Sequence, residues 1–484
     1  MMIGGKKYLV SMTCGALALM LAASGVQAQP LDTRSAAPAA AELERLPSFA
    51  DLVEKVSPAV VSIRVAEERA ARAPANVPDL PFPPGSPFER FFRDLQPQDP
   101  GGAPRGRQGM ALGSGFIISA DGYIVTNNHV VGDGKNITVV RNDGSELPAK
   151  LIGRDPKTDL ALVKVEGKDL PYVAFGDSDE VRVGDWVLAV GNPFGLGGTV
   201  TTGIVSARGR EIGAGPYDDF IQIDASINRG NSGGPTFDVR GNVIGVNTAI
   251  FSPTGGSVGI GFAIPSSIAQ KVVAQLQEDG KVTRGWLGVT IQQVDPEMAA
   301  SLALDKPKGA LVAQVADDSP AKKAGVQIGD VILNVDGKEM EDVRAVSRTV
   351  AELKPDTRSK LVVWRDGRSR TLTANIGTFP DTVDVAAATP DDTPAPGTTT
   401  SLGLALTETP DGVVVQSVDP ASDAAEKGVR PGDVIVKVSG KDVKRTADVV
   451  AGVEAASKAD KSSVLLLLRS DEQQRFVALS LSKS

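Results

Sequence analysis

One stretch near the C-terminal end of this chain occurs twice, and this limits the folds that the chain can adopt. The pattern Gly-Val-x-x-Gly-Asp-Val-Ile begins at Gly325 and again at Gly428, so matched residues lie 103 positions apart. Repetition at such a period is typical of one duplicated module. The segment between the copies is rich in Pro, Thr, Asp and Ala, which is typical of a flexible linker. We expect two modules at 281–377 and 401–484, joined by a linker at 378–400.

A different pattern runs from Gly113 to about Pro265. Short Val- and Ile-rich runs alternate there with Asp-Gly, Asn-Asp-Gly and other Gly-rich turns. Many short strands at this spacing favour barrels or a sandwich over a sheet with crossover helices, so the chain is expected to be mainly β. The runs that indicate strands are 116–118, 123–125, 137–140, 160–163, 186–190, 199–205, 220–223 and 243–246.

Two segments frame the start of this region. A polar-then-apolar stretch, 48–56, predicts a helix that leads into a strand at Ala59–Ile63. Residues 67–108 are rich in Pro and Gly, which predicts a long loop inserted in the domain. Its apolar cluster, Phe88–Leu95, has residues at spacings that line one side of a short helix. Docking of a partner and packing of the loop on itself both explain this cluster.

The N-terminus resembles a secretory signal peptide. Lys6 and Lys7 precede an apolar run at Tyr8–Leu21 that is too short to span a bilayer, and Val26-Gln27-Ala28 fits a cleavage site. We expect a signal peptide at 1–28, cut after Ala28, and a tether at 29–46; the alternative is a membrane anchor. Cys14 is the only cysteine. The mature chain would therefore contain no disulfide.

Composition excludes several functions. The net charge of −8 is spread along the chain without a dense basic patch, which argues against nucleic acid as a partner. No phosphate-binding Gly-x-x-x-x-Gly-Lys-[Ser/Thr] motif occurs, so ATP is not expected, and no other cofactor is indicated. A single histidine cannot supply the His-Glu-x-x-His motif of a zinc hydrolase. A mature chain without a thiol excludes a cysteine hydrolase, and no metal is expected.

The single histidine, His129, lies about a hundred residues before Ser232, which is flanked by glycines in Gly-Asn-Ser-Gly-Gly-Pro. A nucleophilic serine needs a nearby base that is neutral near pH 7, and an imidazole meets this need. Asp159 stands at the start of an apolar run, where its carboxylate could hold the imidazole in one tautomer. A strand-end histidine, a turn aspartate and a serine in a glycine turn remain the alternatives. The order His, Asp, Ser is that of chymotrypsin-type barrels.

These motifs resemble the Do/HtrA serine endoproteases, specifically the DegP/DegQ-like members of the cell envelope, from about residue 47 to the end. The resemblance implies a protease domain at 47–270 made of two six-stranded β-barrels, followed by two PDZ domains. It also implies that Ser232 attacks the peptide carbonyl, that His129 is the general base and that Asp159 orients it. By the same likeness, the backbone N–H groups of Gly230 and Ser232 form the oxyanion hole.

Substrate preference follows from the residues around Ser232. Trypsin-type enzymes that select a basic P1 residue carry an aspartate six positions before the serine, where this chain has Ser226. The resemblance places Ile227, Phe251 and Ile260 around the S1 pocket. We expect a small apolar pocket that favours Val, Ala or similar P1 residues, although Phe251 is bulky for such a wall.

The PDZ resemblance predicts where peptide C-termini bind. In these domains a peptide adds as a strand to a sheet edge, and its carboxylate meets backbone N–H groups of a loop. In the first copy that substrate-binding loop would be Arg284, Gly285, Trp286, Leu287 and Gly288, which lead into Val289. The second copy has Ser401–Leu404 there, without the arginine and tryptophan. It is either a second peptide site or a module for assembly.

Regulation and assembly rest on the resemblance. Arg210 matches an arginine that relays peptide binding in this family; a solvated charge is the alternative. The family forms trimers that join into larger cages, so a homo-oligomer is expected. The chain is thus expected to be an ATP-independent periplasmic serine endoprotease for unfolded or misfolded proteins, with a chaperone-like holding role. The alternative is a non-catalytic PDZ scaffold with a degenerate protease domain.

Overall fold

A computed structural model describes residues 48–67, 109–132, 134, 136–193, 197–213, 217–228, 230–252, 256–380, 398–399, 402–410, 412–470 and 473–481. Within it, Ala50–Ser484 form one compact unit. The predicted signal peptide, the cluster Phe88–Leu95 and most of the predicted linker lie outside the described residues. In the part of the chain that is described, no helix has the length and apolar character needed to cross a membrane.

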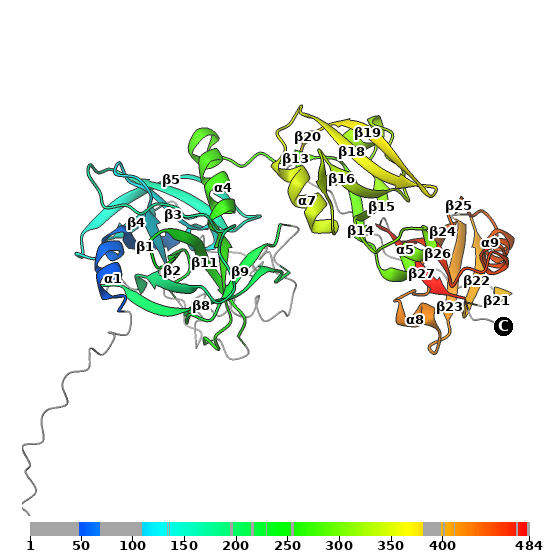
Figure 1. The fold of residues 1–484 in the computed structure, drawn as a ribbon, viewed down its shortest axis with the longest axis horizontal. Coiled ribbons are helices and arrows are strands. Elements are labelled where there is room, and N and C mark those ends of the chain that lie inside the picture. The colour runs from blue at the N-terminus through cyan, green and yellow to red at the C-terminus, as the bar shows by residue number, and fades with distance from the viewer. Residues whose placement is uncertain are drawn as a thin grey trace, which may run out of the picture. The chain divides into compact units, whose positions relative to one another are not determined.

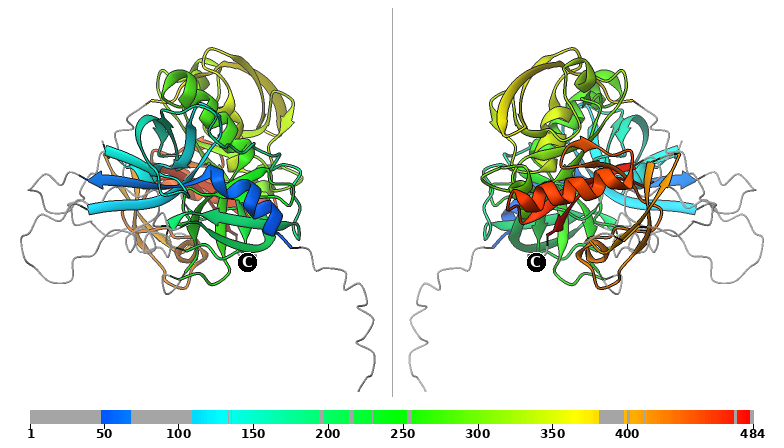
Figure 2. Two further views of the ribbon diagram at one scale, coloured as in Figure 1. Left: turned by 90° about the vertical axis from the view of Figure 1, so that its left-hand side faces the viewer. Right: turned by 90° about the vertical axis from the view of Figure 1, so that its right-hand side faces the viewer.

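The N-terminal half contains two closed six-stranded barrels (Figure 1). The predicted first helix is α1 (Ala50–Val56), which leads through a 3-10 turn at Ser57–Ala59 into the first barrel; it is drawn in blue in Figure 2. The strands of the first barrel, in the order β1-β2-β3-β6-β5-β4, are β1 (Val60–Glu67), β2 (Gly109–Ile117), β3 (Tyr123–Asn127), β4 (Asn136–Val140), β5 (Glu146–Asp155) and β6 (Leu160–Val165). A short helix, α3 (Asn128–Val131), follows β3.

The second barrel has the strand order β10-β11-β12-β9-β8-β7. Its strands are β7 (Trp186–Gly191), β8 (Thr199–Arg210), β9 (Phe220–Ile223), β10 (Pro235–Phe237), β11 (Val243–Ile250) and β12 (Gly261–Pro265). All eight residues of β11 are buried, as expected for a strand with protein on both faces. The helix α4 (Ser266–Asp279) leaves β12 and contacts β5 and β6 of the first barrel as well as β11 of the second. The prediction of barrels is confirmed.

The two repeated modules share the order of their main strands and helices, but, among the described residues, α5 (Pro296–Ser301) occurs only in the first, and the strands at the sheet edges differ. The first contains β13 (Gly285–Trp286), β14 (Val289–Gln293), α5 (Pro296–Ser301), β15 (Ala310–Val315), α6 (Pro320–Lys323), β16 (Val331–Val335), β17 (Lys338–Glu339), α7 (Val343–Glu352), β18 (Arg358–Arg365), β19 (Arg368–Asn375) and β20 (Gly377–Thr378). Its main sheet has the order β14-β15-β16-β18-β19, with β17 beside β16, while β13 pairs with β20. The Val-Ile positions that end the repeated pattern are the first two residues of β16. Both are buried, which explains why they are apolar.

The second module contains β21 (Thr398–Thr399), β22 (Leu404–Thr409), β23 (Gly412–Val418), α8 (Asp423–Glu426), β24 (Val434–Val438), β25 (Lys441–Asp442), α9 (Thr446–Lys458), β26 (Ser463–Ser470) and β27 (Gln473–Ser480). Its sheet order is β21-β22-β23-β24-β26-β27, with β25 beside β24. The helix α9, orange-red in the right-hand view of Figure 2, buries Val449 and Val453 in the core of this module. Each module has its own apolar core.

Candidate active site

Strand pairing in the first barrel brings His129 next to Asp159. β3 pairs with β6 so that Asn127 lies opposite Leu160. His129 therefore follows one strand at the level where Asp159 precedes the other. The His129 Nδ1 lies 2.7 Å from Asp159 Oδ2, and the His129 backbone N–H donates to Oδ1 at 2.9 Å. A carboxylate can only accept here, so Nδ1 carries the proton and Nε2 is left as the basic nitrogen.

Hydrogen bonds fix both the backbone carbonyl and the carboxylate of Asp159. Its backbone has a φ of 57°, in the left-handed region that Asp tolerates better than most residues. Its carbonyl oxygen accepts hydrogen bonds from the backbone of Asn128 at 3.0 Å and the side chain of Asn127 at 2.9 Å. The hydroxyl of Thr248, on β11 of the second barrel, donates to Oδ2 at 2.6 Å. The carboxylate is thus fixed by groups from both barrels, and only 14% of its side chain is exposed.

Ser232 lies in the turn before β10 and is 3% exposed. Its hydroxyl donates to the carbonyl oxygen of Thr248 at 3.4 Å, and the hydroxyl of the same threonine binds Asp159. Thr248 therefore connects the serine to the His–Asp pair. On the other side, Ser114 of β2 donates its backbone N–H to the Ser232 carbonyl at 2.9 Å. The first barrel thus supports the loop that the second barrel presents.

The glycines around Ser232 permit contacts that a side chain would prevent. Gly233 has a φ of 84°, and a Cβ there would lie 2.2 Å from the Ser114 carbonyl oxygen. Gly230 has a φ of 97°, and a Cβ there would lie 2.3 Å from Cβ of Pro193. The Ser114 hydroxyl donates to the Gly230 carbonyl at 2.5 Å and accepts from the Asn192 N–H at 2.8 Å. These contacts set the direction of the peptide planes on both sides of the serine.

The residues predicted for the S1 pocket occupy two neighbouring segments. Ile227 is completely buried, and a Cβ on Gly261 would lie 2.9 Å from its Cγ1. The Phe251 backbone N–H donates to the Ile260 carbonyl at 3.0 Å, and the Phe251 side chain is 37% exposed. Ser226, at the position that decides for a basic P1 residue, is exposed and carries no charge. The structure brings Phe251 and Ile260 together and leaves Ile227 without solvent-exposed surface.

Arg284 has a partner that the sequence did not indicate. Its guanidinium forms two hydrogen bonds with the Asp155 carboxylate, at 2.9 and 2.5 Å, and both side chains are nearly buried. It also lies over the ring of Tyr217, 4.8 Å from the centroid. Burial of the ring raises the pKa of Tyr217. The Arg284 charge lowers this pKa and the Asp155 charge raises it, so Arg284 offsets the effect of burial only in part. The cation predicted for a peptide carboxylate is therefore already engaged by Asp155.

Hydrogen bonds to its backbone carbonyls fix the conformation of the rest of the predicted peptide loop. The Leu287 carbonyl accepts from the Ala321 N–H and the Gly288 carbonyl from the Ala316 N–H, both at 2.9 Å. In a trans peptide the C=O and N–H point in opposite directions, so the N–H groups of Gly288 and Val289 point away from those partners. Gly285 packs closely against α7, since a Cβ there would lie 2.3 Å from the Val350 carbonyl. Trp286 lines a separate hollow with Gly377 and Thr378.

Arg210 ends β8 and pairs with Phe220 at the start of β9. Its Nε donates to the Gln222 side chain at 2.9 Å, and the residue is exposed. Its neighbours carry ion pairs to α7 of the first module: Glu211 pairs with Arg344, and Asp219 with Arg348 at 2.5 Å. Arg210 therefore lies at the paired ends of β8 and β9, next to the residues that contact the first module.

Comparison with known proteins decides what this arrangement belongs to. Residues 113–246 match the trypsin-like peptidase domain, and 285–376 and 400–478 match the PDZ domain. The chain is 53% identical over 460 residues to a probable periplasmic serine endoprotease, DegP-like, of Brucella suis biovar 1, with 90% of each chain covered. A protein of the same description from Rhizobium meliloti is 47% identical over 501 residues, covering 97% of this chain and 99% of that protein.

The chain belongs to the DegP-like periplasmic serine endoproteases. A solved structure described as the HtrA-type protease AlgW with decapeptide is 43% identical and superposes with a TM-score of 0.56, covering 69% of this chain and 100% of that chain. This DegP-like chain is therefore a periplasmic serine endoprotease with two closed barrels and two PDZ domains. The predicted family, fold class, enzyme class and compartment are confirmed.

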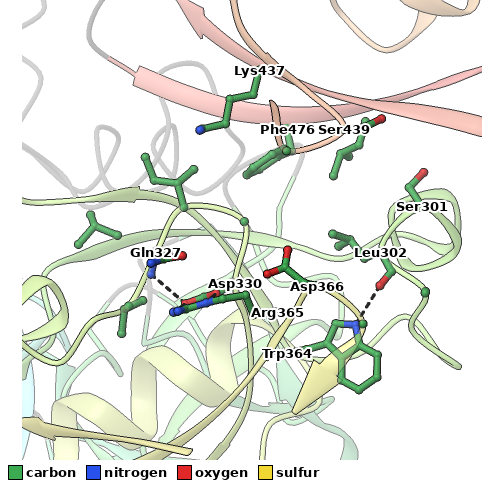
Figure 3. Close-up of a pocket in the computed structure, with 18 of the residues that line it drawn as sticks. Ser301, Leu302, Gln327, Asp330, Trp364, Arg365, Asp366, Lys437, Ser439 and Phe476 are labelled. Atoms are coloured by element: carbon green, nitrogen blue, oxygen red, sulfur yellow. Dashed lines mark hydrogen bonds and ion pairs between the residues drawn. The ribbon is translucent and has the colours of Figure 1, made fainter. Parts of the chain in front are cut away.

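The two PDZ domains of this DegP-like protease also share an interface. An apolar cluster contains Met298 and Leu311 of the first domain with Leu465 and Phe476 of the second. A cavity of about 870 Å³ lies beside it (Figure 3). Arg365 in its wall is bound by Asp330 at 2.6 Å, so that charge is compensated within the wall. None of the three predicted catalytic residues lines this cavity.

Two residues at the candidate active site of this DegP-like protease were not predicted from the sequence. The glycines on both sides of Ser114 were a signal in the sequence, because they mark tight packing. A Cβ on Gly113 or Gly115 would lie 2.6 or 2.9 Å from neighbouring atoms. Thr248 had no such signal, because a threonine in an apolar strand is ordinary. Within the described part of the chain, no three His, Cys, Asp or Glu side chains are grouped as a metal would require.

Proposed function

We propose that Ser232 is the nucleophile of this endoprotease, His129 its general base and acid, and Asp159 the group that fixes the imidazole. The observation that carries the proposal is the His129–Asp159 contact of 2.7 Å, joined to Ser232 through Thr248. Nε2 of His129 takes the Ser232 Oγ proton as Oγ bonds to the peptide carbonyl carbon, and gives it to the leaving amine. Water, deprotonated by the same nitrogen, then hydrolyses the acyl-enzyme and restores Ser232.

The developing oxyanion is proposed to be bound by the backbone N–H groups of Gly230 and Ser232. Fixed donors in a water-poor site stabilise such a charge without reorganisation during the reaction. Support comes from the burial of the loop and from Ser114, whose hydroxyl and N–H bind the Gly230 and Ser232 carbonyls.

A small aliphatic P1 residue is proposed as the preferred one. The uncharged Ser226 supports this, since a basic P1 side chain would find no carboxylate at that position. Phe251 and Ile260 would supply apolar surface, with Ile227 buried behind them, and Phe251 would limit the depth of the pocket. Cleavage after Lys or Arg is expected to be slow.

The substrates are proposed to be unfolded or misfolded proteins, degraded without ATP, with a holding activity alongside. PDZ domains and protease relatives fit the binding of peptide and protein substrates. The first PDZ domain would take a peptide C-terminus at the N–H groups of Gly288 and Val289, as an added strand along β14. Tethering the same chain raises the effective concentration of its interior near Ser232.

Further features remain proposals that rest on the family resemblance. Arg210 is proposed to relay peptide binding, and the ion pairs beside it, Glu211–Arg344 and Asp219–Arg348, support a link to the first PDZ domain. A trimer or a multiple of it is proposed as the working assembly. Cleavage after Ala28 and the domain limits 47–270, 281–377 and 401–484 are proposed as well, and the matched ranges of the domain models support the last three.

Digestion of casein by the purified mature protein tests the proposal. Wild type and Ser369→Ala, a change at an exposed serine of β19, should degrade it equally with or without a chelator. Ser232→Ala should not degrade it but should still bind it. Degradation that depends on a metal, or that survives in Ser232→Ala, would refute the proposed mechanism.

A further inference from the structure

The two PDZ domains differ at the sheet edge where a peptide would add. In the first, β14 is the terminal strand of the described sheet, and the preceding segment, β13, pairs with β20 instead. In the second, β21 pairs antiparallel with β22, with Thr398 opposite Leu406 and Thr399 opposite Ala405. The other neighbour of β22 is β23. In the described part of the chain, β14 therefore has one paired strand along its length and β22 has two.

The strands β14 and β22 hold equivalent places in their domains. Each is tied at its far end to the helix that faces it. The Gln293 side chain accepts from the Val343 N–H at the start of α7, at 3.3 Å. The Glu408 side chain accepts from the Thr446 N–H at the start of α9, at 2.8 Å, and from its hydroxyl at 2.6 Å.

The loops before these strands also match. Gly288 and Gly403 have φ values of 79° and 74°. The Gly288 carbonyl accepts from the Ala316 N–H at 2.9 Å, and the Gly403 carbonyl from the Asp419 N–H at 2.8 Å. These two donors lie 103 positions apart, at the period of the repeat.

These hydrogen bonds fix the direction of the next amide in each strand. Because the C=O and N–H of a trans peptide point in opposite directions, the N–H groups of Val289 and Leu404 point to the outer edge of each sheet. In the first domain this is the edge at which we place a peptide. In the second domain β21 pairs along the same edge of β22.

We propose that the end of the interdomain linker, Thr398–Thr399, is an internal strand ligand that occupies the peptide-accepting edge of the second PDZ domain. Each chain then takes free peptide C-termini at its first PDZ domain only, a statement that rests on the proposed peptide site along β14. A peptide can enter the second domain only by displacing β21, which is covalently tethered and therefore present at high effective concentration. The linker thus determines which of the two copies receives substrate.

Peptide stoichiometry in the full-length Ser232→Ala protein is the first test. The probe is a short labelled peptide ending in a free Val carboxylate, with its amidated form as the reference. The parent protein should bind one peptide per chain. The Gly288→Val variant should lose this binding, since a Cβ there would lie 2.3 Å from Ser319.

Proline substitution in β21 tests whether this strand blocks the second domain. Thr398→Pro with Thr399→Pro removes two N–H donors from β21 and should raise the stoichiometry to two peptides per chain. The matched control, Ala386→Pro with Ala387→Pro, places two prolines in the linker outside β21 and should stay at one.

An engineered disulfide between β21 and β22 is the second test. No cysteine follows Ala28 in the natural sequence, so no other disulfide can form in the mature chain. Thr399 and Ala405 lie directly opposite each other, so Thr399→Cys with Ala405→Cys should oxidise to an intramolecular bond. The oxidised protein should still bind one peptide per chain. Failure of the bond to form under mild oxidation would overturn the proposal.

Hydrogen exchange of the backbone provides a readout without peptide. Amides of 404–406 should be protected in the parent protein and lose protection in Thr398→Pro with Thr399→Pro, while 289–291 should exchange faster than 404–406. A parent that binds two peptides per chain, or 404–406 amides that exchange as fast as those of 289–291, would overturn the proposal. If the parent binds no peptide, the site proposed on β14 is wrong, and the exchange of 404–406 alone decides whether β21 occupies the second domain.

Discussion

The two barrels contribute to the active site in different ways. The first supplies the His129–Asp159 pair from the ends of two strands that pair directly, β3 and β6, so the proposed base is assembled within one barrel. The second supplies Ser232 from a turn whose carbonyls are bound by Ser114 of the first. The position of the proposed base depends on strand register, whereas the position of the proposed nucleophile depends on contacts between the barrels.

Each barrel also supports the other's reactive group. Thr248 of the second barrel donates to Asp159, and Ser114 of the first donates to the Gly230 and Ser232 carbonyls. Changes within the His–Asp pair should therefore alter proton transfer, while changes at Thr248 or Ser114 should alter position. Activity can therefore be lost in two ways that measurement can separate.

The largest effect is expected from removal of the nucleophile. Ser232→Ala should lower kcat by roughly 10⁶-fold, as loss of the attacking oxygen does in other serine proteases. The melting temperature should change little, since the hydrogen bond from the hydroxyl to the Thr248 carbonyl is long, at 3.4 Å. Turnover of a chromogenic peptide and a thermal melt measure both; kcat within tenfold of wild type would remove Ser232 from the chemistry.

The next largest effect concerns the pair within the first barrel. Asp159→Asn should lower kcat by about 10⁴-fold, because a neutral amide can no longer hold Nδ1 protonated and stabilise the imidazolium. Binding of substrate to the variant should be nearly unchanged. A tenfold rise in Kd with an unchanged single-turnover rate would show that Asp159 acts in binding instead.

Acidification should reproduce loss of the base without mutation. The chain has one histidine, and an imidazole that gains a proton cannot accept one from serine. kcat/KM should fall steadily as the pH is lowered from neutrality, and recover when the pH is raised. A profile of kcat/KM that is flat from pH 5 to 8 contradicts His129 as the base.

The contacts between the barrels should have the smallest effects. Thr248→Val and Ser114→Ala each remove hydroxyl hydrogen bonds and should lower kcat by about tenfold, the equivalent of ~1.4 kcal/mol. Thr248→Val should also shift the acid limb of the pH profile, whereas Ser114→Ala should leave that limb in place. Identical pH profiles for the two variants and wild type would remove the distinction between support of the base and support of the nucleophile.

Much of the fold was predictable because apolar runs mark buried strands. The strand β11 is buried along its whole length, and its Val-Ile run is visible in the sequence. The strand β5 was not indicated, because residues such as Pro148 and Lys150 give it a largely polar sequence and a partly exposed face. It forms by pairing with β4 and β6, and the residues of β5 alone do not indicate this pairing.

The candidate site shows the same limit. His129, Asp159 and Ser232 stand in motifs specific enough to be predicted from the sequence. Strand pairing then places His129 beside Asp159, whereas Ser232 is positioned by contacts between the barrels. Arg284 was expected beside a peptide carboxylate, yet its buried partner is Asp155, 129 positions away. A pairing between charges so far apart depends on how the domains pack, and no local pattern indicates it.

Covalent labelling shows whether Ser232 is a nucleophile that His129 activates. The mature protein is treated with a fluorophosphonate, which reacts with activated serines, and the modified peptide is identified by mass spectrometry. One adduct per chain is expected on Ser232, formed at least a thousandfold more slowly in both His129→Ala and Asp159→Asn. An adduct on another serine, or equal labelling of wild type and His129→Ala, would contradict the proposed roles of Ser232 and His129.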